Sequence, residues 1–522
     1  MRFSDYYRVG VLVCVLGVNV LGVNAEAGDW FQWRGPKGDG VSTETNWSAH
    51  WPADGPKILW QVELGVSDNN DGDSTASVVE GRVYVLGAGH MYCLDAESGK
   101  EVWKIPFGKS HSTPAVENGR VYIYGTHGHF MCLDAVSGET VWSKEMHEDK
   151  FSRRPGAYGY AASPTLMDDV VLISARLDGG ALIALDKKSG DVKWKASHRG
   201  HRGYAFWSSP VVATIEEKKC IVWLTGPSIV GLNPETGETL WKHEIPEENG
   251  KVGCAAASPV VIGNRVVAQY HPPHARGYTF CLEIKEGKAS KVWESRNLAN
   301  WSQSCTGYDG CVFGVDQSPR GNRDREVGAL QCYDIASGKL NWSVYGFGQD
   351  GSGPVRRTRT LAPTGCFTIA DGKMISWANE LVVAEISATG HRVLCSAKLP
   401  HVGYRATPVL SNGRLYLRTR SGKLLCVDVG KRQQAAADNQ STVSKPVAKE
   451  TIAKKTVVGS PQSKRNRSRP LGGKPVGERF EKSKPAVGEM LPDVSGYSPD
   501  GKELPLKSLR GHYTVLVFGC LT

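Results

Sequence analysis

The chain holds 13 cysteines, whose thiol groups could take part in redox chemistry or bind a metal ion. A CxxC unit, or cysteines and histidines at zinc-finger spacing, would predict a redox or metal site. The sequence has neither pattern, and the HPPH segment at 271–274 is more typical of a turn than of a metal site. It also lacks a Gly-rich phosphate loop, a GxSxG turn and an HExxH helix. We therefore predict no metal centre and no catalytic constellation in the main body of the chain.

Many of the cysteines lie inside apolar, strand-like runs such as MYCLD and LLCVD. In such a run Cys behaves as a small buried hydrophobe. We expect core positions for Cys93, Cys132, Cys281, Cys332 and Cys426. Cys305 and Cys311 are close in sequence, and a local disulfide between them is a further hypothesis for an exported protein.

Arginine and aromatic side chains gather in several segments that connect the strand-like runs. Guanidinium forks and planar rings on one surface would suit a protein, peptide, glycan or anionic ligand. The candidate ligand-binding residues are Arg153, Tyr160, Arg202, Tyr204, Trp207, Trp301, Arg357, Tyr404 and Arg405. The alternative is that the aromatic rings cover the apolar ends of the strands and the charges face water, because connecting loops are polar in any case.

The strands that must position the candidate ligand-binding residues belong to an internal sequence repeat. Five segments carry an acid or Asn, a Gly four residues later and a Trp four residues after the Gly. They are Asp95/Gly99/Trp103, Asp134/Gly138/Trp142, Asp186/Gly190/Trp194, Asn233/Gly237/Trp241 and Asp334/Gly338/Trp342. Two further copies are degenerate, Glu283/Gly287/Trp293 and Ile386/Gly390/Leu394. Trp60 lies before the series in the strand-like run ILWQVEL, which resembles the Trp-bearing strand of a repeat but lacks the other strands of one.

Each repeat predicts a small antiparallel sheet. The acid can bond to the turn backbone, the Gly can take the left-handed conformation, and the Trp can pack against a neighbouring repeat. We therefore interpret the repeat acids as structural rather than catalytic. The Trp-to-Trp spacing of 39 to 52 residues is near that of four-stranded propeller blades. The strand around Trp60 can complete the three-stranded sheet of 406–429, so we predict an all-β, eight-bladed β-propeller of four-stranded antiparallel blades over residues 28–430, closed between its two ends.

The units CLDAESGKEVWK and CLDAVSGETVWS, with strands of the type STPAVENGRVYIYG before them, resemble the pyrroloquinoline-quinone (PQQ)-like propeller repeat. That repeat is found in quinoprotein alcohol dehydrogenases and in the propeller subunit of outer-membrane protein assembly. The resemblance covers about residues 30–429 and implies the propeller fold. Quinone-using members carry adjacent cysteines at the cofactor and a Glu, Asn and Asp set around calcium. This sequence has no adjacent Cys pair, so PQQ with calcium is not supported and we expect no cofactor.

Residues 1–27 have the pattern of a secretory signal peptide. Arg2 and Arg8 precede an apolar run of about fifteen residues, and a small-x-small cleavage site follows at 25–27. We expect an exported protein, periplasmic or extracellular, with no transmembrane segment after cleavage. An uncleaved anchor is the alternative. A lipid anchor on Cys14 is not expected, because Val13 stands where a lipoprotein signal has a small residue.

Residues 431–484 predict a flexible, basic linker. This segment holds 14 Lys or Arg and 4 Asp or Glu, so it carries the whole net charge of +10. Its composition cannot bury a core, and its charge could touch an acidic surface. Because the excess charge lies outside the predicted propeller, we expect no nucleic-acid partner.

Residues 485–522 resemble the opening of a thioredoxin-like redoxin domain, with the turn of iodothyronine deiodinase-like members at FGCLT. The matching residues are Gly488, Pro492, Asp493, the turn Asp500-Gly501-Lys502, Leu506, Leu509, Gly511 and the strand 515–518. In such proteins the nucleophilic thiol or selenol stands about five residues after the strand Phe, here beyond Thr522. We expect a coding sequence that continues through a selenocysteine or Cys codon; a frameshift or fragment is the alternative. Cys520 is then the candidate resolving thiol, or else a buried residue at the strand end.

Together these patterns predict an exported propeller that acts as a binding or scaffold module, tethered to the start of a redoxin domain. As given, the chain is not expected to be an enzyme, whereas the intact redoxin would carry out thiol or selenol redox chemistry. A quinone-dependent dehydrogenase and an outer-membrane-assembly scaffold are the alternatives that the repeat leaves open.

Overall fold

The computed structural model describes residues 28–52, 54–65, 74–146, 159–175, 181–198, 207–246, 256–271, 277–298, 300, 303–315, 329–344, 366–378, 380–401, 403, 406–431, and the backbone of 495–497 and 503–505. The chain divides into two compact units, Met1–Ser444 and Lys445–Thr522. Among the residues that the structure describes, there is no helix that is long and apolar enough to cross a membrane.

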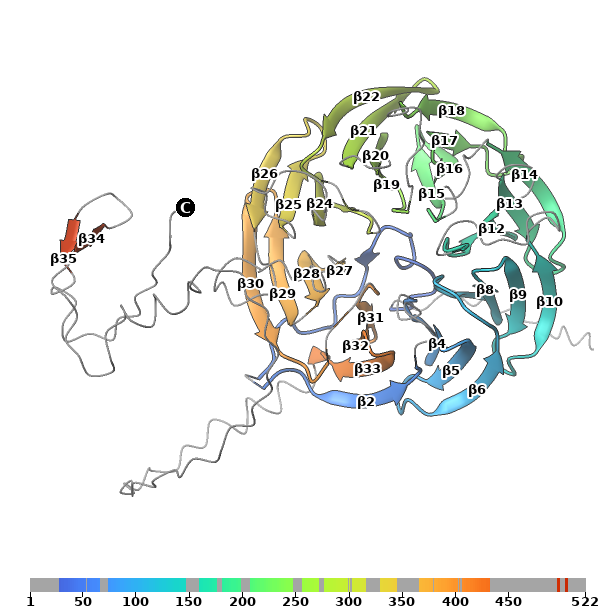
Figure 1. Ribbon diagram of the computed structural model, residues 1–522, viewed down its shortest axis with the longest axis horizontal. Helices are drawn as coiled ribbons and strands as arrows, with labels where there is room; N and C mark the ends of the chain where they lie inside the picture. The colour runs from blue at the N-terminus through green and yellow to red at the C-terminus, as the bar shows by residue number, and fades with distance from the viewer. Residues whose placement is uncertain are drawn as a thin grey trace, which may run out of the picture. The chain divides into compact units, whose positions relative to one another are not determined.

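The first unit is an eight-bladed β-propeller, as predicted (Figure 1). Each blade is a four-stranded antiparallel sheet whose strands follow one another from the channel to the rim. Blades 1 to 4 consist of β3 (Ser77–Val79), β4 (Arg82–Gly87), β5 (His90–Asp95), β6 (Glu101–Pro106); β7 (Ala115–Glu117), β8 (Arg120–Tyr124), β9 (His129–Asp134), β10 (Thr140–Glu145); β11 (Thr165–Met167), β12 (Val170–Ala175), β13 (Ala181–Asp186), β14 (Val192–Ser197); and β15 (Val211–Ile215), β16 (Lys218–Leu224), β17 (Ser228–Leu232), β18 (Thr239–Glu244).

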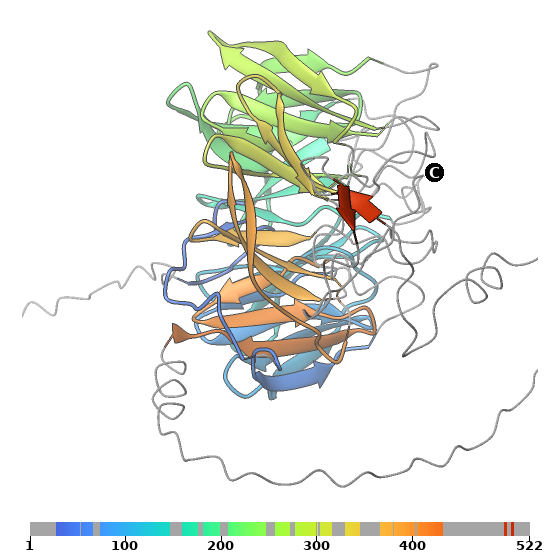
Figure 2. The same ribbon diagram turned by 90° about the vertical axis from the view of Figure 1, so that its left-hand side faces the viewer.

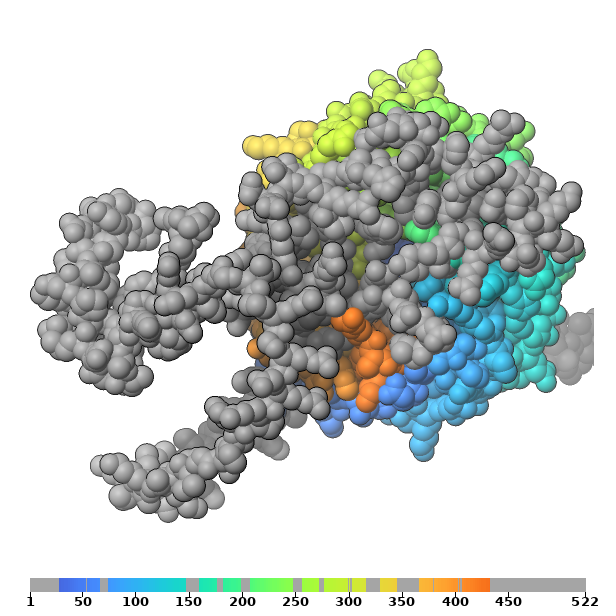
Figure 3. All heavy atoms as spheres, viewed as in Figure 1, coloured from blue at the N-terminus to red at the C-terminus, as the bar shows by residue number. Residues whose placement is uncertain are grey.

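The remaining blades repeat the arrangement, and the ring closes between the two ends of the chain. Blades 5 to 8 consist of β19 (Val260–Ile262), β20 (Arg265–Tyr270), β21 (Tyr278–Lys285), β22 (Lys288–Ser295); β23 (Thr306–Tyr308), β24 (Cys311–Val315), β25 (Leu330–Asp334), β26 (Leu340–Val344); β27 (Phe367–Ala370), β28 (Lys373–Trp377), β29 (Leu381–Ser387), β30 (Gly390–Ala397); and β31 (Val409–Ser411), β32 (Arg414–Arg418), β33 (Lys423–Asp428), β2 (Ile58–Glu63). The strand of Trp60 is the rim strand of blade 8, where Trp60 pairs with Cys426. Figure 3 shows the result on one face, where the orange end of the ring lies beside its blue beginning.

The hydrophobic core lies between neighbouring blades, because each sheet is covered on one face by the blade before it and on the other face by the blade after it. One cluster joins Tyr122 and Phe130 of blade 2 to Val171 and Ile183 of blade 3, all at most 1% exposed. The five cysteines predicted as core residues are fully buried in such clusters. Burial raises the pKa of Cys93 to about 11 and the pKa of Cys132 to about 12, so these thiols stay protonated and inert at neutral pH.

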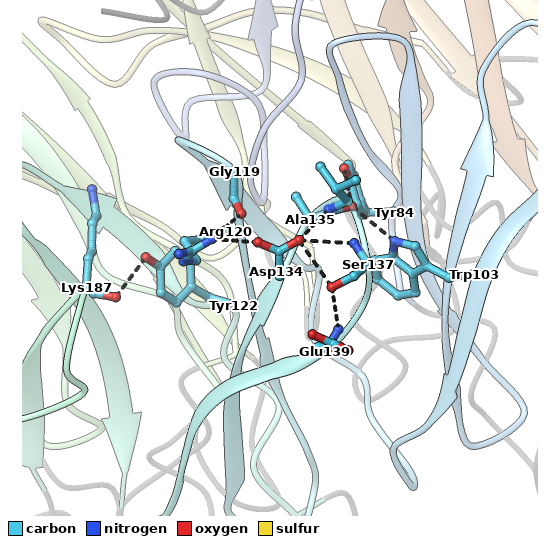
Figure 4. Close-up of polar contacts among 11 residues, drawn as sticks. Tyr84, Trp103, Gly119, Arg120, Tyr122, Asp134, Ala135, Ser137, Glu139 and Lys187 are labelled. Carbon is cyan, nitrogen blue, oxygen red and sulfur yellow. Dashed lines mark hydrogen bonds and ion pairs between the residues drawn. The ribbon is translucent and has the colours of Figure 1, made fainter. Parts of the chain in front are cut away.

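The acid, Gly and Trp of the repeat have the structural roles expected of them, and Figure 4 shows the acid Asp134 and the indole of Trp103 at one turn. The carboxylate of Asp134 accepts hydrogen bonds from the backbone N–H groups of Val136 and Ser137, both at 3.0 Å. Gly138 follows in a left-handed conformation, with φ of 76°. The indole Nε1 of Trp103 in blade 1 donates to the carbonyl of Ala135 at 3.0 Å and so joins this turn to the preceding blade.

One copy departs from the rule at the junction of blades 4 and 5. Glu283/Gly287 has two extra residues before its Trp, and no Trp ring lies near Gly287. Trp241 of blade 4 instead lies against Gly231 of its own sheet, where a Cβ would come within 2.1 Å of the indole. Gly231 stands where blades 1 and 2 carry Cys93 and Cys132, and its missing side chain makes room for the displaced ring.

In the second unit the structure describes one antiparallel pair, β34 (Ser495–Tyr497) with β35 (Glu503–Pro505). Tyr497 pairs with Glu503 across the predicted Asp500-Gly501-Lys502 turn. The turn itself, at residues 498–502, lies outside the described residues, and the redoxin opening stays a prediction. Cys520 lies outside the described residues.

Candidate functional site: the plugged central channel

Polar side chains at the start of the innermost strands, most of them Ser or Thr, bond each blade to the next. Ser74 Oγ donates to the carbonyl of Ser112 at 2.9 Å, which joins blades 1 and 2. Gln303 Nε2 donates to Cys366 Sγ at 2.8 Å, which joins blades 6 and 7. The other six junctions carry Thr113 N to Ser163 Oγ, Ser163 N to Ser209 Oγ, Ser208 Oγ to Ala257 O, Ser258 N to Ser304 Oγ, Thr368 Oγ1 to Pro408 O, and Thr407 N to Thr75 Oγ1. A hydrogen-bonded belt therefore runs round the channel through all eight blades.

Residues 28–48, which we call the plug, run across the centre of the ring (Figure 1) and lie on one side of it (Figure 2). Trp30 exchanges both backbone hydrogen bonds with Val78 of β3, at 2.8 and 2.9 Å. The carbonyl of Phe31 accepts from Val116 N of β7 at 2.8 Å. Gln32 Oε1 accepts from Leu166 N of β11 at 3.0 Å. Consecutive plug residues thus satisfy the inner edges of blades 1, 2 and 3.

The plug then crosses to the far side of the channel. Trp33 Nε1 donates to Ser258 Oγ beside blade 5 at 3.2 Å. The short strand β1 (Val41–Ser42) adds in parallel to the inner edge of β27 in blade 7. Glu44 accepts from Gly413 N at the first turn of blade 8, and burial raises the pKa of this carboxyl. The propeller boundary predicted at residue 28 includes this segment, whose role in the channel the repeat pattern does not reveal.

Arg34 holds the plug against blade 6. Its guanidinium donates through Nη2 to the carbonyl of Cys305 at 2.7 Å and to Thr306 Oγ1 at 3.3 Å. The same group reaches back to the plug carbonyls of Gly38 and Asp39, at 3.1 and 2.6 Å. Arg34 is 5% exposed, and its burial lowers the pKa to about 10, so the side chain remains charged at neutral pH. The cluster of Asp, Trp, Phe, Gln, Trp and Arg at 29–34 is the sequence signal that could have indicated this segment.

A cavity of about 560 Å³ remains where the plug crosses from blade 3 to blade 5. We call it the blade-4 pocket. Its walls are the plug residues 32–33 and 36–39 and the inner strands β11, β15 and β19. The charges in its lining balance, with Lys37 and Lys219 against Asp39 and Asp168. Lys219 and Asp168 form an ion pair at 2.7 Å.

Two of the nine candidate ligand-binding residues lie in the described part of the chain. Tyr160 is 2% exposed, and its ring lies 5.4 Å from that of Tyr124. Trp207 is 7% exposed and donates from Nε1 to the carbonyl of Gly159 at 2.8 Å, so the two neighbouring blade crossings are tied together. Arg153, Arg202, Tyr204, Trp301, Arg357, Tyr404 and Arg405 lie outside the described residues. A ligand-binding role for this set stays a prediction.

The described cysteines are all free thiols, which corrects the hypothesis of a Cys305–Cys311 disulfide. In the β23–β24 hairpin Tyr308 is opposite Cys311, whereas Cys305 lies at the other end of the hairpin against Gly314. Three residues of strand separate the two positions by about 10 Å, too far for a disulfide.

A cofactor site was sought among the described residues through their metal-binding side chains. No group of three or more His, Cys, Asp or Glu side chains among them is arranged to hold a metal ion. Adjacent cysteines, which quinone-using members carry at the cofactor, do not occur in the sequence. The expectation of no cofactor stays a prediction, and we derive no chemistry through PQQ.

Fold and channel together define an eight-bladed propeller built from PQQ-like repeats. The profile of one family, described as outer membrane protein assembly factor BamB, matches residues 48–161 and 128–344, which together make up more than half of the chain. The protein belongs to this family. The match runs to Val344, the last residue of blade 6.

Comparison with individual proteins agrees with this assignment. Outer membrane protein assembly factor BamB of Burkholderia pseudomallei (strain K96243) is 23% identical over 297 residues, 54% of this chain and 68% of the relative. BamB of Moranella endobia (strain PCIT) is 25% identical over 284 residues, 51% of this chain and 68% of the relative.

Solved structures show the same fold in proteins of different activity. BamB from Moraxella catarrhalis superposes with a TM-score of 0.51 at 14% identity, over 72% of this chain and 99% of that one. Quinohemoprotein alcohol dehydrogenase from Comamonas testosteroni gives a TM-score of 0.55 at 15% identity, over 78% and 82%. At these identities the likeness concerns the fold alone.

Proposed function

We propose that this protein is an exported scaffold of the cell envelope whose propeller binds polypeptide partners during the assembly of outer membrane proteins. The family match from residue 48 to the end of blade 6 is the observation that carries the proposal. The plug supports it, because peptide backbone bonded to the inner strands occupies one side of the channel. A propeller arranged in this way offers loops and strand edges for binding.

Binding of an unfolded outer membrane β-barrel protein tests this function. The full chain is titrated into the labelled barrel protein directly after dilution from urea, and fluorescence anisotropy is followed. The matched control is a urea-unfolded, water-soluble helical protein of similar length. We expect saturable binding of the barrel protein and at least tenfold weaker binding of the control. Equal binding of both would overturn the outer-membrane part of the proposal, and binding of neither would overturn the whole.

Export is the second part of the proposal and rests on the pattern of residues 1–27. We expect the exported protein to begin at Gly28, directly after the small-x-small site. N-terminal sequencing of protein recovered from the envelope fraction measures this. An N-terminus at Met1 in that fraction would instead indicate the uncleaved anchor.

We further propose that the propeller works without quinone. Titration of the full chain with PQQ and calcium, followed by desalting, should leave no absorbance of bound cofactor. A stoichiometric absorbance after desalting would favour the dehydrogenase alternative.

For the second unit we propose the opening of a redoxin domain, supported by the hairpin at 495–505 and the residue pattern around it. Sequencing the coding DNA past codon 522 tests this. A UGA or Cys codon followed by a thioredoxin-like frame supports a thiol or selenol oxidoreductase tethered to the propeller. A UAA or UAG codon with no such frame beyond it would contradict that assignment and leave the scaffold function intact.

A further inference from the structure

We propose that an extended, uncharged peptide segment of a partner protein binds in the blade-4 pocket by adding to the open inner edge of β15. This inference rests on the proposed polypeptide-binding function and names the surface that carries it. It follows from one position that recurs in the innermost strand of every blade.

The recurring position lies two residues before the turn that joins the first and second strands of a blade. Val78, Val116, Leu166 and Ile369 occupy it in blades 1, 2, 3 and 7, and the N–H of each donates into the channel to the plug. These donors are not used within the blade, because residues along an antiparallel strand alternate between bonded and non-bonded pairs. The plug therefore satisfies inward-facing donors of the sheets.

Thr214 occupies the same position in blade 4. It pairs with Lys219 across the Glu216-Glu217 turn, as Val78 pairs with Val83 across the Glu80-Gly81 turn. By this register the N–H of Thr214 faces the channel. No described residue of the plug reaches it, since Gln32 bonds to blade 3 and Trp33 to the neighbourhood of blade 5.

Burial distinguishes blade 4 from the blades that the plug covers. The equivalent residues in blades 1, 2, 3 and 7 are at most 7% exposed. Thr214 is exposed, and Val212 and Ala213 are half-buried. All three line the blade-4 pocket, and so does Val261, the half-buried equivalent in blade 5. An open strand edge thus forms one wall of the cavity.

The occupant that fits such an edge is another extended peptide. An edge presents N–H and C=O groups in alternation, and a second strand supplies their partners in the same order. The protein already uses this mode on the inner edge of blade 7, where β1 adds in parallel to β27. The open edge and the plug residues 32–33 and 36–39 line the same pocket. The open edge is five residues long, which corresponds to about 16 Å of strand.

The charges around the pocket indicate the chemistry of the segment. Lys219 is neutralised by Asp168 in an ion pair, and Lys37 and Asp39 face the pocket with opposite signs. The lining therefore carries no net charge. A segment of small polar or apolar residues matches it better than an acidic or basic one.

Replacement of Thr214 by Pro tests the inference directly. Proline removes the inward N–H and no bond within the blade, and it is tolerated where the N–H side of a strand is unpaired. The matched control is Thr214→Val, which keeps the N–H and removes the hydroxyl. In the anisotropy titration with the unfolded barrel protein, T214P should bind about 3- to 10-fold more weakly, and T214V should bind like the wild type.

Hydrogen exchange on the wild-type protein provides the second measurement, independent of whether T214P folds. The amides of Val212 and Thr214 should exchange more slowly when the unfolded barrel protein is bound. The Val116 amide, which the plug already protects, should not change. Unaltered binding by a folded T214P, or no slowing at Val212 and Thr214 in the complex, overturns the inference and leaves the proposed function standing. Failure of the wild-type chain to bind overturns both.

Discussion

The indole ring of Trp103 in blade 1 lies against Gly138 in blade 2, so closely that a Cβ on Gly138 would come within 2.8 Å of the ring. The same relationship recurs around the propeller in the pairs Trp60/Gly99, Trp142/Gly190, Trp194/Gly237 and Trp293/Gly338. Each ring also donates from Nε1 to a carbonyl of the turn that it covers, as Trp142 does to Lys187 at 3.1 Å. The Trp of one blade is thus fixed by the turn of the next.

Gly138→Ala should destabilise the propeller on two grounds. The backbone has φ of 76°, and the new methyl group would meet the Trp103 ring. We expect the free energy of unfolding to fall by about 2 to 4 kcal/mol, measured by urea denaturation. Gly119→Ala is the matched control, since Gly119 has φ of 69° with open space around its Cα. Its loss should be only about 1 to 2 kcal/mol, from the backbone alone. Equal losses would mean that the ring contact contributes nothing.

Asp186 should make the stability of the propeller depend on pH in the acid range. Hydrogen bonds from the Ser189 backbone, then Lys193 and the Lys188 backbone, lower the pKa of its carboxyl to about 2. A folded-state pKa below the unfolded value stabilises the protein above the unfolded pKa of about 4. This contribution is lost as the pH falls from about 4 to about 2.

Asp186→Asn isolates this effect, because Asn233 shows that an amide also supports the turn. We expect the difference in Tm between wild type and D186N to shrink steadily from pH 5 to pH 2. Differential scanning calorimetry at fixed ionic strength measures it. A constant difference across this range would contradict the role assigned to the carboxylate.

Arg34→Met should loosen the plug from blade 6. The substitution leaves the carbonyls of Cys305 and Asp39 without their donor in a buried site. We expect a loss of about 3 kcal/mol or more in the free energy of unfolding. Arg392→Met is the control, since Arg392 pairs with Glu385 at a site where its side chain is 71% exposed, and its effect should stay within about 0.5 kcal/mol. Similar losses in both variants would show that the buried guanidinium has no special part in holding the plug.

The described cysteines should resist alkylation in the folded protein. Nine of them are buried, and burial raises the pKa of Cys305, for example, to about 12. Only Cys395 is partly exposed. Treatment with iodoacetamide at pH 7, followed by peptide mass spectrometry, should modify Cys395 first and the others only after addition of urea. Rapid labelling of Cys305 in the native protein would show that the channel opens at the plug.

The fold could be predicted from the sequence because each copy of the repeat makes the same contacts, within its own turn and with the next blade. An acid, a Gly and a Trp at fixed spacing each have one physical role in a turn or a blade junction, and all three roles appear in the structure. The closure of blade 8 by the strand of Trp60 followed from counting strands, since an open ring would leave two sheet edges unpaired. The burial of the strand cysteines followed from their apolar neighbours.

The channel could not be predicted in this way, because its contacts join residues that are far apart in the sequence. Arg34 meets Cys305 across 271 residues, and Gln32 meets Leu166 across 134. Thr214 is a polar residue where the other inner strands carry an aliphatic residue or Gly, but this difference does not say where the plug crosses the ring. The exposure of Thr214 depends on where the plug crosses the ring, which is decided by the positions of eight blades together. The sequence by itself thus determined the blades and their order, because their contacts recur at a fixed period, whereas only the tertiary structure decided which inner edges the plug covers and that the edge of β15 is left open.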